Sequence, residues 1–280
     1  MFLFSQPQVK GLLRRLFYRV RFELEGIDQV PRQGPGILIM NHTGWEEILI
    51  TILAIDRPLK IVGMRELIYF DEGESMARVF DTGYAREFSP LRCRLASLLG
   101  KMLGKAIRRQ LLEFGYIPTR IFTDVWPPVL GGNGIREIVR ALEEGNLVLF
   151  FPEGGYKRDG VMRPFKPGLG LILRLLERRG IRVPVIPGAQ HAAASINGAL
   201  RNRFTPRLIF GRPIVYSVAG FPAGGFDKEV IMALQREVNS LLSLAWPDHP
   251  PQTYSDCHQG NSRMRMFLNT IGEPSDSRQR

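Results

Sequence analysis

The sequence predicts an α/β fold, in which a single domain is built around a mostly buried mixed sheet flanked by helices. Short apolar runs recur along the chain and are separated by segments with helical periodicity, which is the pattern of this class. With 280 residues, 44% of them hydrophobic and 23% charged, the chain is long enough to bury a large core. No internal repeat or interdomain linker is evident, so one domain is the simplest organisation.

Each apolar run is read as a strand and each periodic segment as a helix. The expected strands are residues 36–40, 59–63, 116–122, 146–151, 182–187 and 207–211. The expected helices between and after them are residues 43–54, 134–144, 169–179 and 227–244.

The domain boundaries follow from composition. Residues 1–24 form a basic amphipathic helix, and residues 25–246 form the main domain, within which 65–114 are a mainly helical insertion. Residues 247–280 are rich in Pro, Ser and Asn, which predicts a loosely ordered tail. Cys93 and Cys257 match no metal or redox spacing, so neither a disulfide framework nor a metal site is expected.

The net charge of +11 indicates an anionic partner, and the candidates are nucleic acid, an anionic membrane and an anionic substrate. In the first helix the apolar residues fall within an arc of about 140° at 100° per residue, and basic residues occupy the rest. The apolar set is Val9, Leu12, Leu13, Leu16, Phe17 and Val20, and the basic set is Lys10, Arg14, Arg15, Arg19 and Arg21. Such a helix suits an anionic membrane surface, but it could equally pack on its own domain.

A second basic amphipathic segment favours the membrane. One of its faces carries Leu91, Leu95, Leu98, Leu99, Met102 and Ala106, flanked by Arg94, Lys101, Lys105 and Arg108. Nucleic acid is not expected as a partner, because no helix-turn-helix, zinc-finger spacing or RNP-like strand accompanies the charge. No uninterrupted apolar run of membrane-spanning length occurs, so we expect a cytoplasmic protein that is peripheral on the inner face of the membrane.

The most informative motif follows the first long apolar run. Thr43 and Glu46 have the spacing of a capping box that opens a helix, which places His42 before the cap and Glu47 at the fourth helical position. These two side chains can therefore meet, and a carboxylate on one ring nitrogen leaves the other free to accept a proton from a hydroxyl. A histidine at a helix start is more often a surface or capping residue, so the motif alone leaves catalysis open.

The second motif is the run from Leu147 to Phe151, which ends in Pro152-Glu153-Gly154-Gly155. Proline stops the strand, and two glycines let backbone N–H groups approach a ligand closely. Lys157 and Arg158 lie just beyond and could bind phosphate or an oxyanion. Taken alone, the pattern favours an ordinary turn over a binding site.

Read together, these segments resemble the glycerophospholipid acyltransferase family. Its blocks are Asn-His with a carboxylate after four further residues, a glycine and apolar residues ending in arginine, Phe-Pro-Glu-Gly, and an apolar strand ending in proline. This chain has them in that order: Asn41-His42 with Glu47, Gly115 to Arg120, Phe151-Pro152-Glu153-Gly154, and Val183 to Pro187. Phe165-Lys166-Pro167-Gly168 and Phe210 to Ile214 also fit, so the resemblance spans roughly residues 22–216.

The resemblance implies transfer of a fatty acyl group from acyl-CoA or acyl carrier protein to a lysophospholipid hydroxyl, with 1-acylglycerol 3-phosphate as the favoured acceptor. His42 would be the general base and Glu47 would orient its ring. Arg120 would bind the acceptor phosphate, and Glu153 with Gly154 would shape the acceptor site. Beyond the acyl donor, no cofactor or metal is implied.

The chain departs from the family in two motifs of the site. Glu47 stands where the family usually has aspartate, and Gly155-Tyr156 stand where it usually has Thr-Arg, which leaves Lys157 or Arg158 to supply the missing charge. A second hypothesis follows from these departures: a catalytically silent relative that binds lipid or membrane without acyl transfer.

Overall fold

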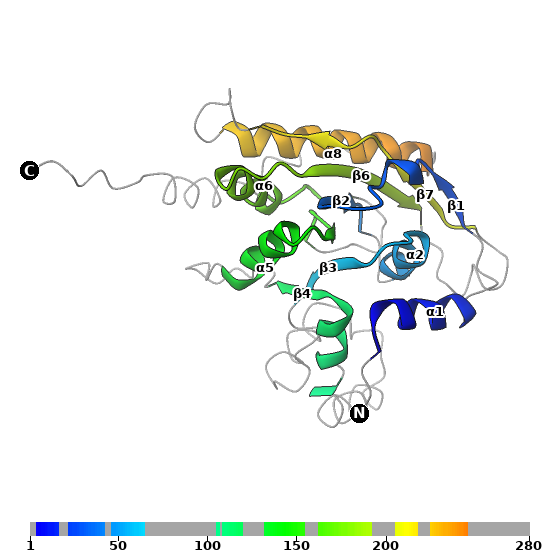
Figure 1. Cartoon of the computed structure of the whole chain (residues 1–280). Coiled ribbons are helices and arrows are strands. Elements are labelled where there is room, and N and C mark those ends of the chain that lie inside the picture. The colour runs from blue at the N-terminus through cyan, green and yellow to red at the C-terminus, as the bar shows by residue number, and fades with distance from the viewer. Residues whose placement is uncertain are drawn as a thin grey trace, which may run out of the picture.

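The structure is a computed structural model of the whole chain. It describes residues 4–16, 22–42, 46–64, 105–106, 108–119, 132–154, 162–191, 205–217 and 225–245. These residues form an eight-stranded mixed sheet with helices on both faces, which confirms the predicted fold class (Figure 1). Residues 65–104 of the predicted insertion, the predicted tail and both cysteines lie outside the described residues.

Each of the six predicted strands is present, and two short strands join them. The strands are β1 (Glu23–Glu25), β2 (Gly36–Met40), β3 (Leu59–Met64), β4 (Tyr116–Thr119), β5 (Leu147–Phe150), β6 (Pro184–His191), β7 (Arg207–Phe210) and β8 (Ile214–Val215). Their order across the sheet is β1-β7-β6-β2-β5-β3-β4, with β8 also paired to β6. Strands β6, β2, β5, β3 and β4 run parallel, whereas β7 and β8 pair with β6 in the antiparallel sense.

The connections from β2 and β5 leave in opposite directions across the sheet. From β2 the chain passes through α2 (Glu46–Ala54) and over β5 to reach β3, whereas from β5 it passes through α6 (Gly168–Arg178) and over β2 to reach β6. Because parallel crossovers are right-handed, opposite directions place α2 and α6 on opposite faces. The carboxyl ends of β2 and β5 are therefore the point of the sheet at which open α/β folds place their ligand sites.

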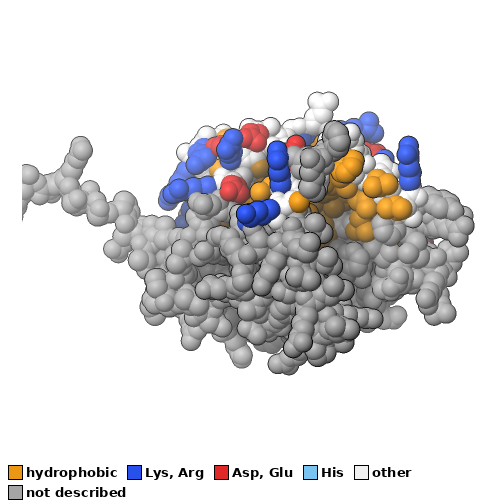
Figure 2. Space-filling view, turned by 90° about the horizontal axis from the view of Figure 1, so that it is seen from below, with side chains coloured by type: hydrophobic (Ala, Val, Ile, Leu, Met, Phe, Trp, Pro, Cys, Tyr) orange, Lys and Arg blue, Asp and Glu red, His pale blue; other side chains and the backbone are white. Residues whose placement is uncertain are grey.

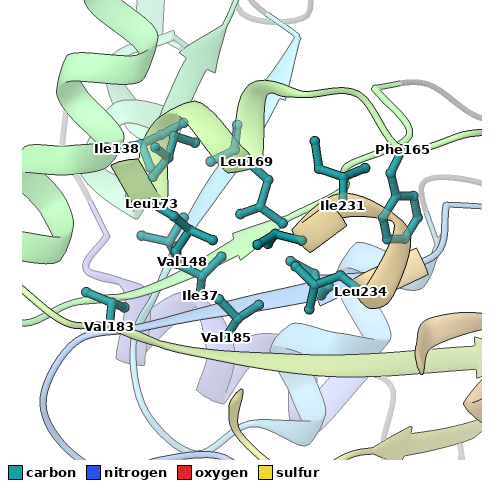
Figure 3. Close-up of a cluster of buried hydrophobic side chains, with 14 of the residues drawn as sticks. Ile37, Ile138, Val148, Phe165, Leu169, Leu173, Val183, Val185, Ile231 and Leu234 are labelled. Carbon is teal, nitrogen blue, oxygen red and sulfur yellow. The ribbon is translucent and has the colours of Figure 1, made fainter. Parts of the chain in front are cut away.

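Successive side chains of β2 point to opposite faces of the sheet and belong to two separate hydrophobic cores. Ile37 and Ile39 face α5 (Gly132–Glu143), α6 and α8 (Gly225–Ala245), whose apolar residues pack together on that side (Figure 3). Leu38 and Met40 face the other side, where α2 packs. All four side chains are essentially inaccessible, so β2 is the central strand of the molecule.

Helix α1 (Gln6–Leu16) packs beside α2, on the same face of the sheet (Figure 1). The side of α1 that faces the protein differs from the one that the apolar pattern predicts. Gln6 and Lys10 are buried and Val9 is half-buried, whereas Leu12 and Leu16 are 54% and 62% exposed. The expected separation into an apolar face and an outward basic face is therefore wrong for Lys10. Its burial, with the positive charge of Arg14 nearby, lowers the pKa of Lys10 to about 8.

Polar contacts explain why α1 adopts this orientation. The side-chain amide of Gln6 donates to the carbonyls of Leu59 and Phe114, each over 2.7 Å, and accepts the Leu59 N–H over 2.7 Å. Arg14 donates to the Leu53 carbonyl over 3.2 Å and pairs with Asp56 over 2.6 Å, which lowers the pKa of that carboxyl. Among the described helices, none has the length and hydrophobicity needed to cross a bilayer.

Candidate active site at the carboxyl ends of the central strands

The two motifs singled out in the sequence meet at one edge of the sheet. Strands β2 and β5 are parallel neighbours, with Ile39 opposite Phe150. The residues that follow each strand, Asn41-His42 and Phe151 to Gly154, therefore emerge side by side at the carboxyl ends. The direction of the chain connections also reverses at this edge, so the motifs occupy the position where this class of sheet places its sites.

Asn41 ties the end of β2 to the end of β6. Its side-chain amide donates to the Gln190 carbonyl over 3.0 Å and its side-chain oxygen accepts the Gln190 N–H over 2.8 Å. Asn41 is 1% exposed and Gln190 is fully buried. The amide thus continues the β2–β6 ladder beyond Met40 and fixes the backbone that enters His42. The Thr51 hydroxyl of α2 adds a 3.3 Å bond to the Gln190 side chain.

His42 is held through both its backbone and its ring. Its backbone N–H donates to Glu153 Oε1 over 2.6 Å. Its imidazole stacks on the Phe151 ring, with centroids 4.5 Å apart and 28° between the planes. Since Glu153 and Phe151 both follow β5, this strand fixes the position of a histidine that follows β2.

Glu153 has its carboxylate turned into the protein. It is 1% exposed, and while Oε1 accepts the His42 N–H, Oε2 accepts the Arg163 N–H over 2.6 Å. Charge-assisted bonds to two backbone donors stabilise a buried carboxylate. Glu153 therefore links the β2–α2 junction to the segment that leads into α6, and its predicted contact with the acceptor stays a prediction.

Gly154 adopts a left-handed backbone conformation and packs directly against a lysine. Its φ is +64°, and an added Cβ would lie 2.8 Å from Lys166 Nζ and 2.9 Å from Lys166 Cε. The Lys166 N–H also donates to the Pro152 carbonyl over 2.8 Å, which closes the turn onto the same segment. Burial, together with the charge of Arg163, lowers the pKa of Lys166. In the sequence Lys166 stands out only as part of the Phe165-Lys166-Pro167-Gly168 block, and nothing in that block predicts its contact with Gly154.

The side chains of the remaining predicted site residues lie outside the described residues. Glu47 lies in the first turn of the described part of α2, but its side chain is outside the description, as is Thr43. Arg120, Lys157 and Arg158 are also outside the described residues. Within the described part of the chain, no three His, Cys, Asp or Glu side chains lie close enough together to hold a metal ion.

Comparisons with known proteins find a family match over the segment that contains β5 and the turn after it. The family model Acyltransferase matches residues 129–190, which include β5, the Phe151 to Gly154 turn and α6. Among solved structures, the chain is similar to the crystal structure of the 1-acyl-sn-glycerophosphate (LPA) acyltransferase PlsC from Thermotoga maritima. The identity is 18% and the TM-score 0.49, over 84% of this chain and 79% of that chain. No curated protein matches the sequence.

The match of residues 129–190 to the Acyltransferase family model supports the family resemblance and the enzyme class that the ordered motifs predict.

Proposed function

We propose that this protein is a membrane-peripheral O-acyltransferase. It transfers a fatty acyl group from acyl-CoA or acyl carrier protein to the hydroxyl of a lysophospholipid, with 1-acylglycerol 3-phosphate as the favoured acceptor. The observation that carries the proposal is the junction of His42 with the Phe151 to Gly154 turn, since a histidine held by this turn is a rigidly positioned proton acceptor. The match of residues 129–190 to the acyltransferase family supports the reaction class.

In the proposed reaction His42 is the general base. As the acceptor oxygen attacks the thioester carbonyl carbon, a ring nitrogen of His42 takes the hydroxyl proton and a tetrahedral oxyanion forms. When that intermediate collapses, the carbon–sulfur bond breaks and the imidazolium returns the proton to the thiolate. The products are an ester and a free thiol, and no acyl-enzyme, metal or further cofactor takes part.

Glu47 is the proposed partner of the His42 ring. It follows His42 by five positions and lies in the first described turn of α2, whose start is at the same edge of the sheet. A carboxylate that accepts one ring N–H fixes the tautomer and stabilises the imidazolium that forms during attack. The extra methylene relative to aspartate is accommodated if the helix start lies slightly farther from the ring.

The membrane contact is proposed for the face on which α1 lies. Phe4, Leu12 and Leu16 expose 54–62% of their surface, and Phe4 is bound through its backbone to the Gln110 side chain of the helical residues 108–114. Leu112 of that segment is 43% exposed. Viewed from this side, hydrophobic side chains gather together with lysine and arginine side chains around them (Figure 2). Apolar side chains flanked by cations suit an interface with anionic headgroups.

Release of CoA tests the catalytic part of this proposal. Purified protein is mixed with acyl-CoA, a thiol reagent and a panel of lysophospholipids, and the free thiol is measured. We expect acceptor-dependent thiol release that His42→Ala reduces by at least roughly 100-fold, because general-base catalysis contributes about 10²–10⁴-fold. No release with any acceptor, or undiminished release by His42→Ala, would favour a catalytically silent relative that binds lipid or membrane.

Vesicle co-sedimentation tests the membrane part. The double variant Leu12→Ser, Leu16→Ser removes two exposed leucines of α1, and the matched control Val215→Ser, Leu244→Ser removes exposed apolar side chains elsewhere. We expect only the first pair to weaken binding to vesicles that contain an anionic phospholipid. Equal binding by both variants would mean that α1 is not the membrane contact.

A further inference from the structure

Two cationic side chains beside the candidate active site, Lys166 and Arg163, have no anionic partner among the residues that the structure describes. Lys166 and Arg163 lie close enough for the charge of Arg163 to act on the Lys166 ammonium. The Arg163 Nε atom is buried and has no hydrogen-bond partner within the described part of the chain. The ion pairs between described residues include neither Lys166 nor Arg163. Partly buried cations without counter-ions are costly to maintain, so such a pair indicates a place for an anionic ligand.

The Lys166 ammonium occupies a space that the sequence keeps open. It lies against Gly154, where an added Cβ would come within 2.8 Å of Lys166 Nζ and 2.8 Å of Lys166 Cδ. The only residue type that leaves this space is glycine, and the φ of +64° at this position also favours glycine. The turn of the third motif is thus shaped to receive the lysine head.

Both cations are tied rigidly to the histidine of the site. The backbone N–H of Arg163 donates to one oxygen of Glu153, whose other oxygen accepts the N–H of His42. The backbone N–H of Lys166 donates to the Pro152 carbonyl in the same turn. An anion held by the two cations would consequently lie at a fixed position relative to the proposed general base.

We propose that Lys166 and Arg163 bind the phosphate monoester of the acyl acceptor and replace the arginine that is absent after Gly154. This inference rests on the proposed acyltransferase function and names the acceptor class for that site. At neutral pH a phosphate monoester carries nearly two negative charges, which matches two cations. Guanidinium groups donate hydrogen bonds in a fork that fits phosphate oxygens, while an ammonium adds a compact charge.

Steady-state kinetics of side-chain variants test the proposal. Lys166→Met and Arg163→Met keep the backbone N–H groups that bond to Pro152 and Glu153. We expect each variant to raise the KM for 1-acylglycerol 3-phosphate roughly 10- to 100-fold, the cost of one charged hydrogen bond. The KM for acyl-CoA and the rate with monoacylglycerol, which lacks the phosphate, should stay unchanged. The control Lys228→Met removes an exposed lysine of α8 and should alter none of these constants.

The same measurements contain the results that would overturn the proposal. A rise in the KM for acyl-CoA alone would assign the two cations to the phosphates of the donor. Unchanged constants for both substrates in both variants would leave the pair without a role in substrate binding. Urea unfolding of each variant shows whether a kinetic change arises from loss of fold instead.

A binding experiment keeps this inference separate from the proposed function. The wild-type protein is acetylated slowly with acetic anhydride, and the rate at Lys166 is followed by mass spectrometry with Lys228 as the internal control. We expect glycerol 3-phosphate to slow acetylation of Lys166 and glycerol to have no effect. Protection by CoA but not by glycerol 3-phosphate, or no protection by either, would overturn the inference. Absence of thiol release by the wild type would instead contradict the proposed function.

Discussion

Glu153 Oε1 accepts the backbone N–H of His42 over 2.6 Å, although 111 residues separate the two in the sequence. With Oε2 bonded to the Arg163 N–H, the carboxylate joins three segments at the carboxyl edge of the sheet. Both donors are backbone N–H groups, so the carboxylate holds the two segments in position and takes no part in proton transfer through these bonds. The glutamate of the Phe-Pro-Glu-Gly motif thus has a structural reason to be present whatever it contributes to substrate binding.

The first prediction concerns replacement of that carboxylate. Glu153→Gln keeps the shape but turns an amide N–H₂ toward one of the two backbone donors, which leaves that donor unpaired in a buried site. We expect the free energy of unfolding to fall by about 1–3 kcal/mol and kcat to fall as His42 loses its position. Urea unfolding and the thiol-release assay measure the two effects. An unaltered unfolding midpoint would show that the carboxylate does not hold the two segments together.

The second prediction concerns the amide that joins β2 to β6. Asn41→Ala leaves both the N–H and the carbonyl of Gln190 without their partner in a fully buried position. We expect a loss of about 1–3 kcal/mol for each group in the free energy of unfolding. The comparison variant Asn146→Ala removes a half-buried amide that bonds to Ala141, and it should cost less. Equal losses would contradict the special role given to Asn41.

The third prediction concerns the pH dependence of stability. Below pH 8, Lys10 is charged in both states, so its burial penalises only the folded protein, and Lys10→Met should raise the free energy of unfolding by about 1–3 kcal/mol. The folded state loses this proton near pH 8, whereas the unfolded chain keeps it until about 10.5. The wild type therefore gains stability across that range and the advantage of the variant shrinks.

Urea unfolding at pH 7 and pH 9.5 measures this change. The exposed Lys228→Met serves as the control and should show the same small difference from wild type at both pH values. An advantage of Lys10→Met that stays constant or grows toward pH 9.5 would be inconsistent with a buried Lys10 amine.

The fourth prediction concerns Gly154. Gly154→Ala places a Cβ where the Lys166 head now lies and imposes a left-handed conformation on alanine, which costs about 1–2 kcal/mol. Because the end of a lysine side chain moves easily, we expect the ammonium to swing away while the fold survives. The KM for 1-acylglycerol 3-phosphate should then rise as it does in Lys166→Met, with no further increase in the double variant. Additive effects of the two changes would show that they act independently.

The strands could be predicted well, because apolar runs bounded by turn residues identify them. Strand β6 is the informative exception, since it was expected to end at Pro187 and continues to His191. On that side of β6, β8 pairs as far as Val185 and β7 begins at Gly188, so Pro187 lies in the gap between two ladders. The missing N–H therefore breaks no ladder bond, and only knowledge of the neighbouring strands could reveal this.

The orientation of α1 could not be predicted from its periodicity. The apolar arc indicated a helix, but the inward face is decided by Gln6, whose partners lie 53 and 108 residues away at Leu59 and Phe114. A pattern of hydrophobicity contains no information about such long-range polar contacts. The same limit explains why Lys10 was expected on the outward face and is buried.

The site was predicted in part. The family resemblance predicts that His42 and the Phe151 to Gly154 turn belong to one site. The parallel pairing of β2 with β5 explains why they lie close together. The roles of Asn41 and Lys166 were missed, because each depends on a partner brought near by the fold. The catalytic assignments of His42 and Glu47 remain predictions.

The doubly bonded carboxylate of Glu153 also has a consequence for selectivity. It sets the spacing between the histidine that would receive the proton and the arginine that would help to hold the phosphate, since the His42 N–H is bonded to Oε1 and the Arg163 N–H to Oε2. Such a site would select acceptors by the distance between their free hydroxyl and their phosphate. It would favour molecules by the number of bonds between these two groups, and it would accept acyl chains of different length.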